Sequence, residues 1–263
     1  FYGLEKGFIL KEKFEDASTL QTLWMPDQVS TVASEVDSLF YFILYWVYFF
    51  LAIVIVGGIY FSWKYKSNKR GKTEALDHNN LLEITWTLFP LLLTMVVFFW
   101  GAKTYLKMNI VPYDSMEVNV SAQKWFFTFT YKEGFTLSNE LVVPVDKAVK
   151  LVMESQDVLH GFYIPDFRVK MDIIPNRYMV TWFEATKVGE YDIFCTEYCG
   201  TSHSQMLAKI KVLSKEDYAK WMKTANVVDE SIPLVELGEI IYKKNACYTC
   251  HSIDGSSIIG PSF

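Results

Sequence analysis

The residues best suited to chemistry gather in one stretch, Cys195–Met206. It holds two thiols, an imidazole and a thioether in the spacing C-x3-C-x3-H-x2-M. Thiolates and thioethers are soft ligands that suit copper, and imidazole suits it as well. A further imidazole, His160, lies upstream at the end of a β-like run, from where its side chain could reach the same loop. The sequence therefore predicts a copper site on a loop between two strands.

Three arrangements of these ligands compete. A disulfide between the two cysteines is possible in an oxidising compartment, but it would leave both histidines and the methionine unexplained. A mononuclear blue-copper site uses two His, one Cys and a weak Met, so it leaves one Cys over. Two thiolates can instead bridge two copper ions, each completed by one imidazole and one weak axial ligand. The axial ligands would be Met206 and a backbone carbonyl such as that of Glu197. We favour this dicopper arrangement because it employs every residue of the set.

A second motif lies near the C-terminus, Cys247-Tyr248-Thr249-Cys250-His251. C-x-x-C-H is the attachment signal for c-type haem, with two thioether links and a proximal His. A redox dithiol is the alternative, but such motifs normally lie in a βαβ pattern, which this tail lacks. Apolar residues with helical spacing over 234–244 precede the motif. No Met follows Met222 to act as a distal ligand, so we expect that the native chain continues.

Two long uncharged runs, Leu39–Trp63 and Ile84–Ala102, predict transmembrane helices. The first run, 25 residues long, would form a helix of roughly 37 Å, enough to cross a hydrocarbon core of about 30 Å. Pro90 lies inside the second run and should kink it, which membrane helices tolerate. Five basic residues lie between the runs and none in 20–38, so the connecting loop is expected in the cytoplasm and both termini outside. Phe1 suggests a removed leader or a missing start.

After Pro112 the pattern changes to short alternating runs separated by turn residues, which is typical of an antiparallel sandwich or barrel. Trp125, Phe127, Phe129 and Tyr131 are expected to line one face of a strand. The expected strands are 118–122, 125–131, 140–143, 149–153, 179–184, 190–194 and 206–212. With 51% apolar and 17% aromatic residues and a net charge of −5, the chain is neither disordered nor a basic nucleic-acid binder.

The whole pattern resembles subunit II of cytochrome c oxidase, the haem–copper respiratory oxidase, over residues from about 26 to 213. The matching stretches are Val36–Phe40, Glu83-x-x-Trp86, Gln123–Phe127, Asp157–His160, Phe167–Asp172, Trp182–Thr186 and Cys195–Met206. The resemblance implies a cupredoxin-like Greek-key fold carrying the mixed-valence dicopper centre called CuA. The implied ligands are His160, Cys195, the carbonyl of Glu197, Cys199, His203 and Met206.

The resemblance also implies three further roles. The Glu197 side chain would help to bind magnesium at the boundary with subunit I. Trp125 would be the site where electrons enter, although a core aromatic is the plainer alternative; the family's second Trp is Phe127 here. Glu83 would stand at the mouth of a proton channel, although a carboxylate at a helix N-terminus also favours the macrodipole. His78 receives no role.

The tail is similar to a class I cytochrome c. Glu236-x-Gly238-x-x-Ile241-Tyr242 precedes its haem motif, and Gly260–Phe263 follow it. The expected plan is an outer segment at 1–38, helices at 39–63 and 84–102, a cytoplasmic loop at 64–83, the cupredoxin domain at 113–213, a linker at 214–232 and a partial cytochrome c domain at 233–263.

The implied function is to pass electrons from cytochrome c, here a fused haem c, through CuA to subunit I. There dioxygen is reduced to water with proton pumping. The implied partners are subunit I, other oxidase subunits, membrane lipid, and cytochrome c or another respiratory complex as electron donor. The implied location is a bacterial inner membrane, with the soluble domains on the periplasmic side.

Two alternative functions stay open. One is the CuA module of a nitrous-oxide reductase, which the membrane hairpin and Glu83 oppose, and the other is a copper-delivery protein. A quinol-oxidase subunit II would have lost the copper ligands.

Overall fold

The computed structural model describes residues 25–66, 78–225 and 232–263. The chain divides into two compact units. One comprises residues 34–107 and the other residues 1–33 with 108–263. The basic residues at 69, 70 and 72, on which the predicted orientation partly depends, lie outside the described residues.

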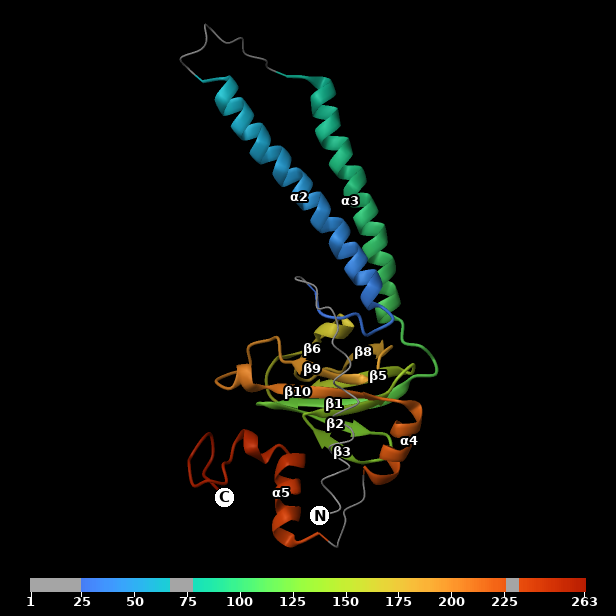
Figure 1. The fold of residues 1–263 in the computed structure, drawn as a ribbon, viewed down its shortest axis with the longest axis vertical. Coiled ribbons are helices and arrows are strands. Elements are labelled where there is room, and N and C mark those ends of the chain that lie inside the picture. Colours follow the sequence, from blue (N-terminus) through green and yellow to red (C-terminus); the bar gives the residue numbers. More distant parts are fainter. Residues whose placement is uncertain (1–24, 67–77, 226–231) are drawn as a thin grey trace. The chain divides into compact units, whose positions relative to one another are not determined.

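The first unit is a pair of long helices, α2 (Ala33–Lys64) and α3 (Asn80–Asn109), which approach each other at the N-terminal end of α2 and diverge toward its C-terminal end (Figure 1). Both helices are longer than the predicted apolar runs, because the residues that flank each run are also helical. Rings join the two helices, with Phe42 and Trp100 at a centroid distance of 5.6 Å and Trp46 and Phe89 at the same distance. Most other apolar side chains of the hairpin are exposed, as lipid-facing residues would be. Helix α3 continues through Pro90.

The second unit holds two five-stranded sheets. The first has the order β3-β2-β1-β5-β8 and the second β4-β10-β9-β6-β7. The strands are β1 (Met116–Gln123), β2 (Phe126–Tyr131), β3 (Thr136–Ser138), β4 (Glu140–Pro144), β5 (Ala148–Ser155), β6 (His160–Ile164), β7 (Val169–Ile173), β8 (Met179–Glu184), β9 (Gly189–Phe194) and β10 (Leu207–Leu213).

The prediction of a purely antiparallel domain is wrong in one respect. β1 pairs with β5 in parallel, and β4 pairs with β10 in parallel. Parallel neighbours need a crossover connection. The chain provides one by leaving the first sheet after β3, forming β4 in the second sheet and returning as β5. The short strands β3, β6 and β7 were also missed, because their few residues show no clear alternation.

Apolar residues from both sheets share one core. Phe127, Phe129 and Tyr131 of β2 are buried, as the alternation predicts. Phe127 meets Phe162 of the opposite sheet edge-to-face at a centroid distance of 5.7 Å. Trp125 lies in the turn before β2 rather than within the strand.

After β10, α4 (Lys215–Thr224) begins with a cap in which the Ser214 hydroxyl accepts a hydrogen bond from the Asp217 amide. Trp221 of α4 packs on the stacked rings of Tyr131 and Phe135. The predicted helix over 234–244 is present as α5 (Leu234–Lys244), and the haem motif follows as the 3₁₀ turn η4 (Cys247–Thr249).

Candidate metal centre

The cysteine-rich loop connects two neighbouring antiparallel strands. β9 ends at Phe194 and β10 begins at Leu207, and these two residues pair directly. The loop closes where the Cys195 amide donates to the Met206 carbonyl at 3.3 Å. The ends of the loop therefore lie side by side, and residues 195 and 206 are neighbours in space.

His160 reaches this loop from an adjacent strand. It is the first residue of β6, which pairs with β9, and not the end of a strand as the sequence suggested. At the next position, a Cβ on Gly161 would stand 2.3 Å from Thr196 Oγ1 and 3.0 Å from the amide nitrogen of Glu197. Glycine therefore lets the loop lie against β6, and the Thr196 amide donates to the Gly161 carbonyl there at 3.3 Å. This close approach delivers the fully buried imidazole to the thiols.

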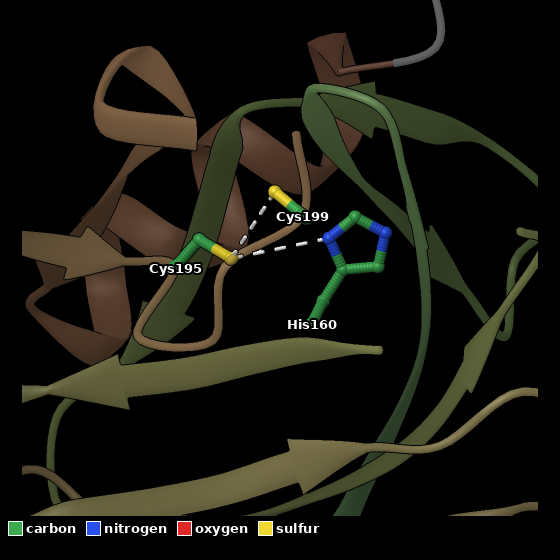
Figure 2. A group of neighbouring side chains, drawn as sticks. All are labelled: His160, Cys195 and Cys199. Carbon is green, nitrogen blue, oxygen red and sulfur yellow. Dashed lines mark hydrogen bonds between the residues drawn. The ribbon is translucent and has the colours of Figure 1, made fainter. Parts of the chain in front are cut away.

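The first three ligand atoms form a compact group (Figure 2). The Cys195 Sγ atom lies 3.9 Å from His160 Nδ1 and 3.8 Å from Cys199 Sγ, and the dashed lines in the figure mark these two contacts. All three ligand atoms lie within 4.8 Å of one another. Cys195 and Cys199 are buried. Such spacing allows a metal ion to bind between the side chains.

The remaining predicted donors complete a second half of the group. Cys199 Sγ lies 3.5 Å from His203 Nδ1, in the 3₁₀ turn η3 (His203–Gln205), and 3.8 Å from Met206 Sδ. Cys195 Sγ lies 3.3 Å from the carbonyl oxygen of Glu197. Each thiol thus has one imidazole and one weak donor beside it. The structure brings together all six donors that the sequence singled out.

Both cysteines are free thiols in the structure. Their sulfur atoms are 3.8 Å apart, well beyond the roughly 2.05 Å of a disulfide bond. Two thiols, two imidazoles, a thioether and a carbonyl form a predominantly soft donor set, which fits copper better than a hard cation such as magnesium.

The two thiols differ in acidity. Burial disfavours the Cys195 thiolate, but hydrogen bonds with His160 and with the backbone at Gly161 and Glu197 outweigh burial and lower its pKa to about 7. Burial and the nearby Cys195 charge raise the pKa of Cys199 to about 12. One thiolate can therefore form in the apoprotein at neutral pH, whereas the second needs the positive charge of a bound metal.

Trp125 packs on the cysteine-rich loop. A Cβ on Gly200 would stand 3.2 Å from Trp125 Cζ2, and the φ angle of Gly200 is +121°. Glycine is required at this position both by the backbone and by the indole against it. The buried indole Nε1 has no hydrogen-bond partner within the part of the chain that the structure describes. The indole therefore lies directly beside the residue that follows Cys199.

Glu197 and Glu83 have bonded partners in the structure. The Glu197 carboxylate lies 3.5 Å from Lys170 Nζ. Glu83 accepts a hydrogen bond from the Asn79 amide at 3.1 Å, and the Asn79 side chain accepts one from the Leu82 amide at 3.0 Å. This reciprocal pattern caps α3, so Glu83 has a structural role at its helix terminus.

A backbone carbonyl of the tail holds the ring of His251. His251 Nδ1 lies 2.8 Å from the Pro261 carbonyl oxygen. A carbonyl only accepts, so Nδ1 carries the proton and Nε2 keeps a free lone pair. A Cβ on Gly260 would stand 2.7 Å from the His251 ring, so this approach needs glycine. A cavity of about 450 Å³ adjoins Cys247, lined by Val235, Gly238, Glu239, Ile241, Tyr242, Ile253 and Phe263 as well.

Three features of the site escaped the sequence analysis. The glycines at 161 and 200 allow close approaches that only the structure reveals. Asp157 binds His160 Nε2 through its Oδ1 atom at 2.7 Å. A carboxylate three residues before a histidine was the available signal, but i, i+3 spacing in a loop does not predict a contact.

Comparison with known proteins matches two family models to this chain. Residues 18–103 match the transmembrane domain of cytochrome c oxidase subunit II, and residues 97–213 match its periplasmic domain. Residues 214–263, with the C-x-x-C-H motif, lie outside both matches.

Individual relatives agree with the family models. Cytochrome c oxidase subunit 2 of Alkalihalophilus pseudofirmus is 28% identical over 227 residues, covering 81% of this chain and 66% of that protein. The Bacillus subtilis protein of the same name is 30% identical over 200 residues, covering 69% and 56%. The crystal structure of the periplasmic domain of subunit II from Bradyrhizobium japonicum is 32% identical with a TM-score of 0.43, covering 44% of this chain and 96% of that domain.

The alignments thus span between about half and two thirds of these two curated relatives. Together the two family models cover both the helical hairpin and the β-sheet domain, and they support a two-pass membrane protein. The chain belongs to the cytochrome c oxidase subunit II family.

Proposed function

We propose that the loop at 195–206 and His160 hold a dinuclear copper centre of the CuA type. The main support is that the two buried thiols are not bonded to each other and that each lies beside one imidazole. The Sγ–Nδ1 distances are 3.9 Å and 3.5 Å. A mononuclear site would leave one of these thiols without a metal. A copper-delivery site must release its metal, whereas His160, Cys199 and Met206 are buried here, which favours retention.

Bound there, a copper pair supplies a one-electron store in which the charge change is shared by two ions. The protein's part is to hold the ligands in place. The closed loop between β9 and β10 fixes both thiols, and the contact at Gly161 fixes the approach of β6. Rigid ligands keep the geometric change on reduction small, which favours fast transfer at low driving force.

Trp125 is the proposed site where electrons enter, because its indole lies against Gly200 in the copper loop. The proposed donor is a haem c bound by Cys247, Cys250 and His251, with cytochrome c or another respiratory complex further upstream. The apolar cavity beside Cys247 and the free Nε2 of His251 fit such a group. Haem bound there supplies a second one-electron carrier.

The proposed acceptor is subunit I, which holds the dioxygen-reducing site of a proton-pumping oxidoreductase, cytochrome c oxidase. The Glu197 side chain would leave Lys170 to share magnesium with that subunit. Glu83 would serve proton uptake in addition to capping α3. The hairpin would cross a bacterial inner membrane, with the loop at 64–83 in the cytoplasm and both termini outside. The domain boundaries expected from the sequence, from the outer segment at 1–38 to the partial cytochrome c domain at 233–263, are part of this proposal.

Removal of the indole tests this electron route. In the copper-loaded full complex, Trp125→Leu should slow reduction of the copper centre by about tenfold or more while copper content stays constant. Phe126→Leu is the matched control, since it removes the neighbouring aromatic ring. The alternation of β2 places this ring on the face of the strand opposite to the buried Phe127. Equal rates in the two variants would refute the role of Trp125. Loss of copper from Trp125→Leu would instead assign the indole a structural role.

A further inference from the structure

Both carboxylate oxygens of Asp157 are used, and each serves a different part of the centre. Oδ1 lies 2.7 Å from His160 Nε2. Oδ2 accepts a hydrogen bond from the Lys124 amide at 2.8 Å, and Lys124 is the residue immediately before Trp125. One side chain therefore touches a metal-ligand ring and the backbone that carries the proposed electron-accepting indole.

The sheet explains why these segments meet. β1 and β5 are parallel neighbours, and their last paired residues are Ala122 and Ser155. Parallel strands in register end at the same edge of a sheet, so the residues that follow them emerge together. The Gln156 amide donates to the Ala122 carbonyl at 3.0 Å and extends the pairing past the strand end. Lys124 and Asp157 are thus placed side by side by the parallel pairing that the sequence did not predict.

The contact with His160 determines the tautomer of its ring. A carboxylate only accepts, so Nε2 carries a proton, and Nδ1 is the ring nitrogen that faces Cys195. Outer carboxylates of this kind fix the orientation of a ligand ring and strengthen it as a ligand. Because His160 has no exposed surface, the ring cannot exchange this partner for water without the loop opening.

The contact with Lys124 restrains Trp125 from the backbone side. The indole itself is held from the other side by Gly200. An indole restrained at its ring, and through the backbone amide of the residue before it, keeps a constant distance to the loop that carries Cys199. Electron transfer depends steeply on such a distance, so a restraint on the peptide has a functional consequence.

We infer that Asp157 is a positioning residue that joins the ligand ring of His160 to the backbone amide of Lys124, the residue before Trp125, so that the copper centre and its electron-accepting indole move as one unit. The electron-transfer part of this inference rests on the proposed function. The joint restraint itself is a property of the apoprotein and can be tested there. A plain turn-stabilising role is the alternative, since Asp157 Oδ1 also accepts from the Val158 amide at 2.6 Å.

The first test uses Asp157→Asn in the apo full chain in detergent. Only four histidines are present, so selective ¹⁵N labelling can report the ring of His160. We expect a protonated Nε2 in the parent chain and its loss in a second variant, Asp157→Ala, which leaves Nε2 without an oxygen acceptor from residue 157. Hydrogen exchange of the Lys124 amide should accelerate at least tenfold in Asp157→Asn. Glu154→Gln is the matched control, because it removes a charge three residues earlier, in β5, from a side chain bonded to Gln156 instead.

A second test uses copper and does not depend on enzyme turnover. Loss of an outer-shell partner typically costs about 10–100-fold in metal affinity, so Asp157→Asn should bind copper more weakly by that factor. In the loaded complex, Trp125→Leu should add little to the slowing that Asp157→Asn already causes, because both act on one unit.

The outcomes separate cleanly. A His160 Nε2 that stays protonated in Asp157→Ala, or equal exchange of the Lys124 amide in Asp157→Asn and Glu154→Gln, overturns the inference. Full additivity of the Asp157 and Trp125 variants overturns its electron-transfer part. If the parent chain binds no copper pair, the proposed function fails, yet the tautomer and exchange results in the apoprotein still decide whether Asp157 joins the two segments.

Discussion

The loop at 195–206 and the tail with the C-x-x-C-H motif differ in how completely the described chain surrounds their cysteines and histidines. Around the loop, His160, Cys199 and Met206 are buried, and the closing contacts come from β6, β9 and β10. In the tail, Cys247 and Cys250 are half-buried, and the apolar side chains of Leu234 and Val235 are more than four-fifths exposed. The loop has a protein core behind it, whereas the tail presents apolar surface.

The difference follows from the kind of group each region is proposed to hold. A copper pair is small, and its ligands must be fixed within tenths of an ångström, so a closed sandwich has to build the site first. A haem is a large apolar ring that itself covers the side chains around it. The tail would therefore need to position only the two cysteines that attach the haem and the ring of His251. The Pro261 carbonyl holds that ring.

Replacing one cysteine in each region by serine should have the largest effect on metal and haem content. Cys199→Ser should abolish the two-copper EPR signal, because one bridging thiolate is lost, while covalent haem is retained. Cys250→Ser should do the reverse, with copper content unchanged. Metal analysis and a haem stain on the same purified chain check both. An intact two-copper signal in Cys199→Ser would refute the ligand assignment, and loss of both groups in either variant would show that the regions do not form independently.

Adding one methyl group at a glycine in each region should have opposite effects. Gly200→Ala forces a Cβ against Trp125 at a φ angle of +121°, so we expect a loss of about 2 kcal/mol and a lower Tm. Gly238→Ala lies in α5 with no atom within 4 Å of the new Cβ, so a gain of up to about 1 kcal/mol is expected from helix propensity. Thermal unfolding of the full chain measures both. A strong loss in Gly238→Ala would show that another segment packs on α5.

One tyrosine in the β-sheet domain and one in the tail extend the comparison of burial. The Tyr131 hydroxyl bonds both the amide and the carbonyl of Val142, and burial raises its pKa above the ordinary value near 10. Its stabilising contribution is therefore fully present below about pH 10 and is lost as the pH rises further toward the folded-state value.

Tyr131→Phe should cost about 1–3 kcal/mol at neutral pH, because the buried Val142 amide loses its partner. The variant should also weaken the dependence of Tm on pH above 10. Tyr242→Phe, whose hydroxyl bonds the His251 carbonyl at a partly buried site in the tail, is the control and should change Tm less. An alkaline dependence that is the same in Tyr131→Phe and the parent chain would contradict the assignment.

The sequence was sufficient wherever chemistry or periodicity was local. The spacing of Cys195, Cys199, His203 and Met206 predicted the donor set, and the uncharged runs predicted both long helices. It was insufficient where residues distant in the chain meet. The parallel pairing of β1 with β5 depends on a crossover through the second sheet, and no local pattern encodes it. Asp157 could therefore be seen in the sequence but not assigned, because its partner Lys124 is 33 positions away.

The central claim is that His160 and the loop at 195–206 hold two coupled copper ions. EPR of the full chain loaded with a single copper isotope, together with metal analysis, tests it most directly. We expect two copper ions per chain and a hyperfine pattern in which one unpaired electron is shared equally by both nuclei. One copper ion per chain, with the pattern of a single nucleus, would contradict it.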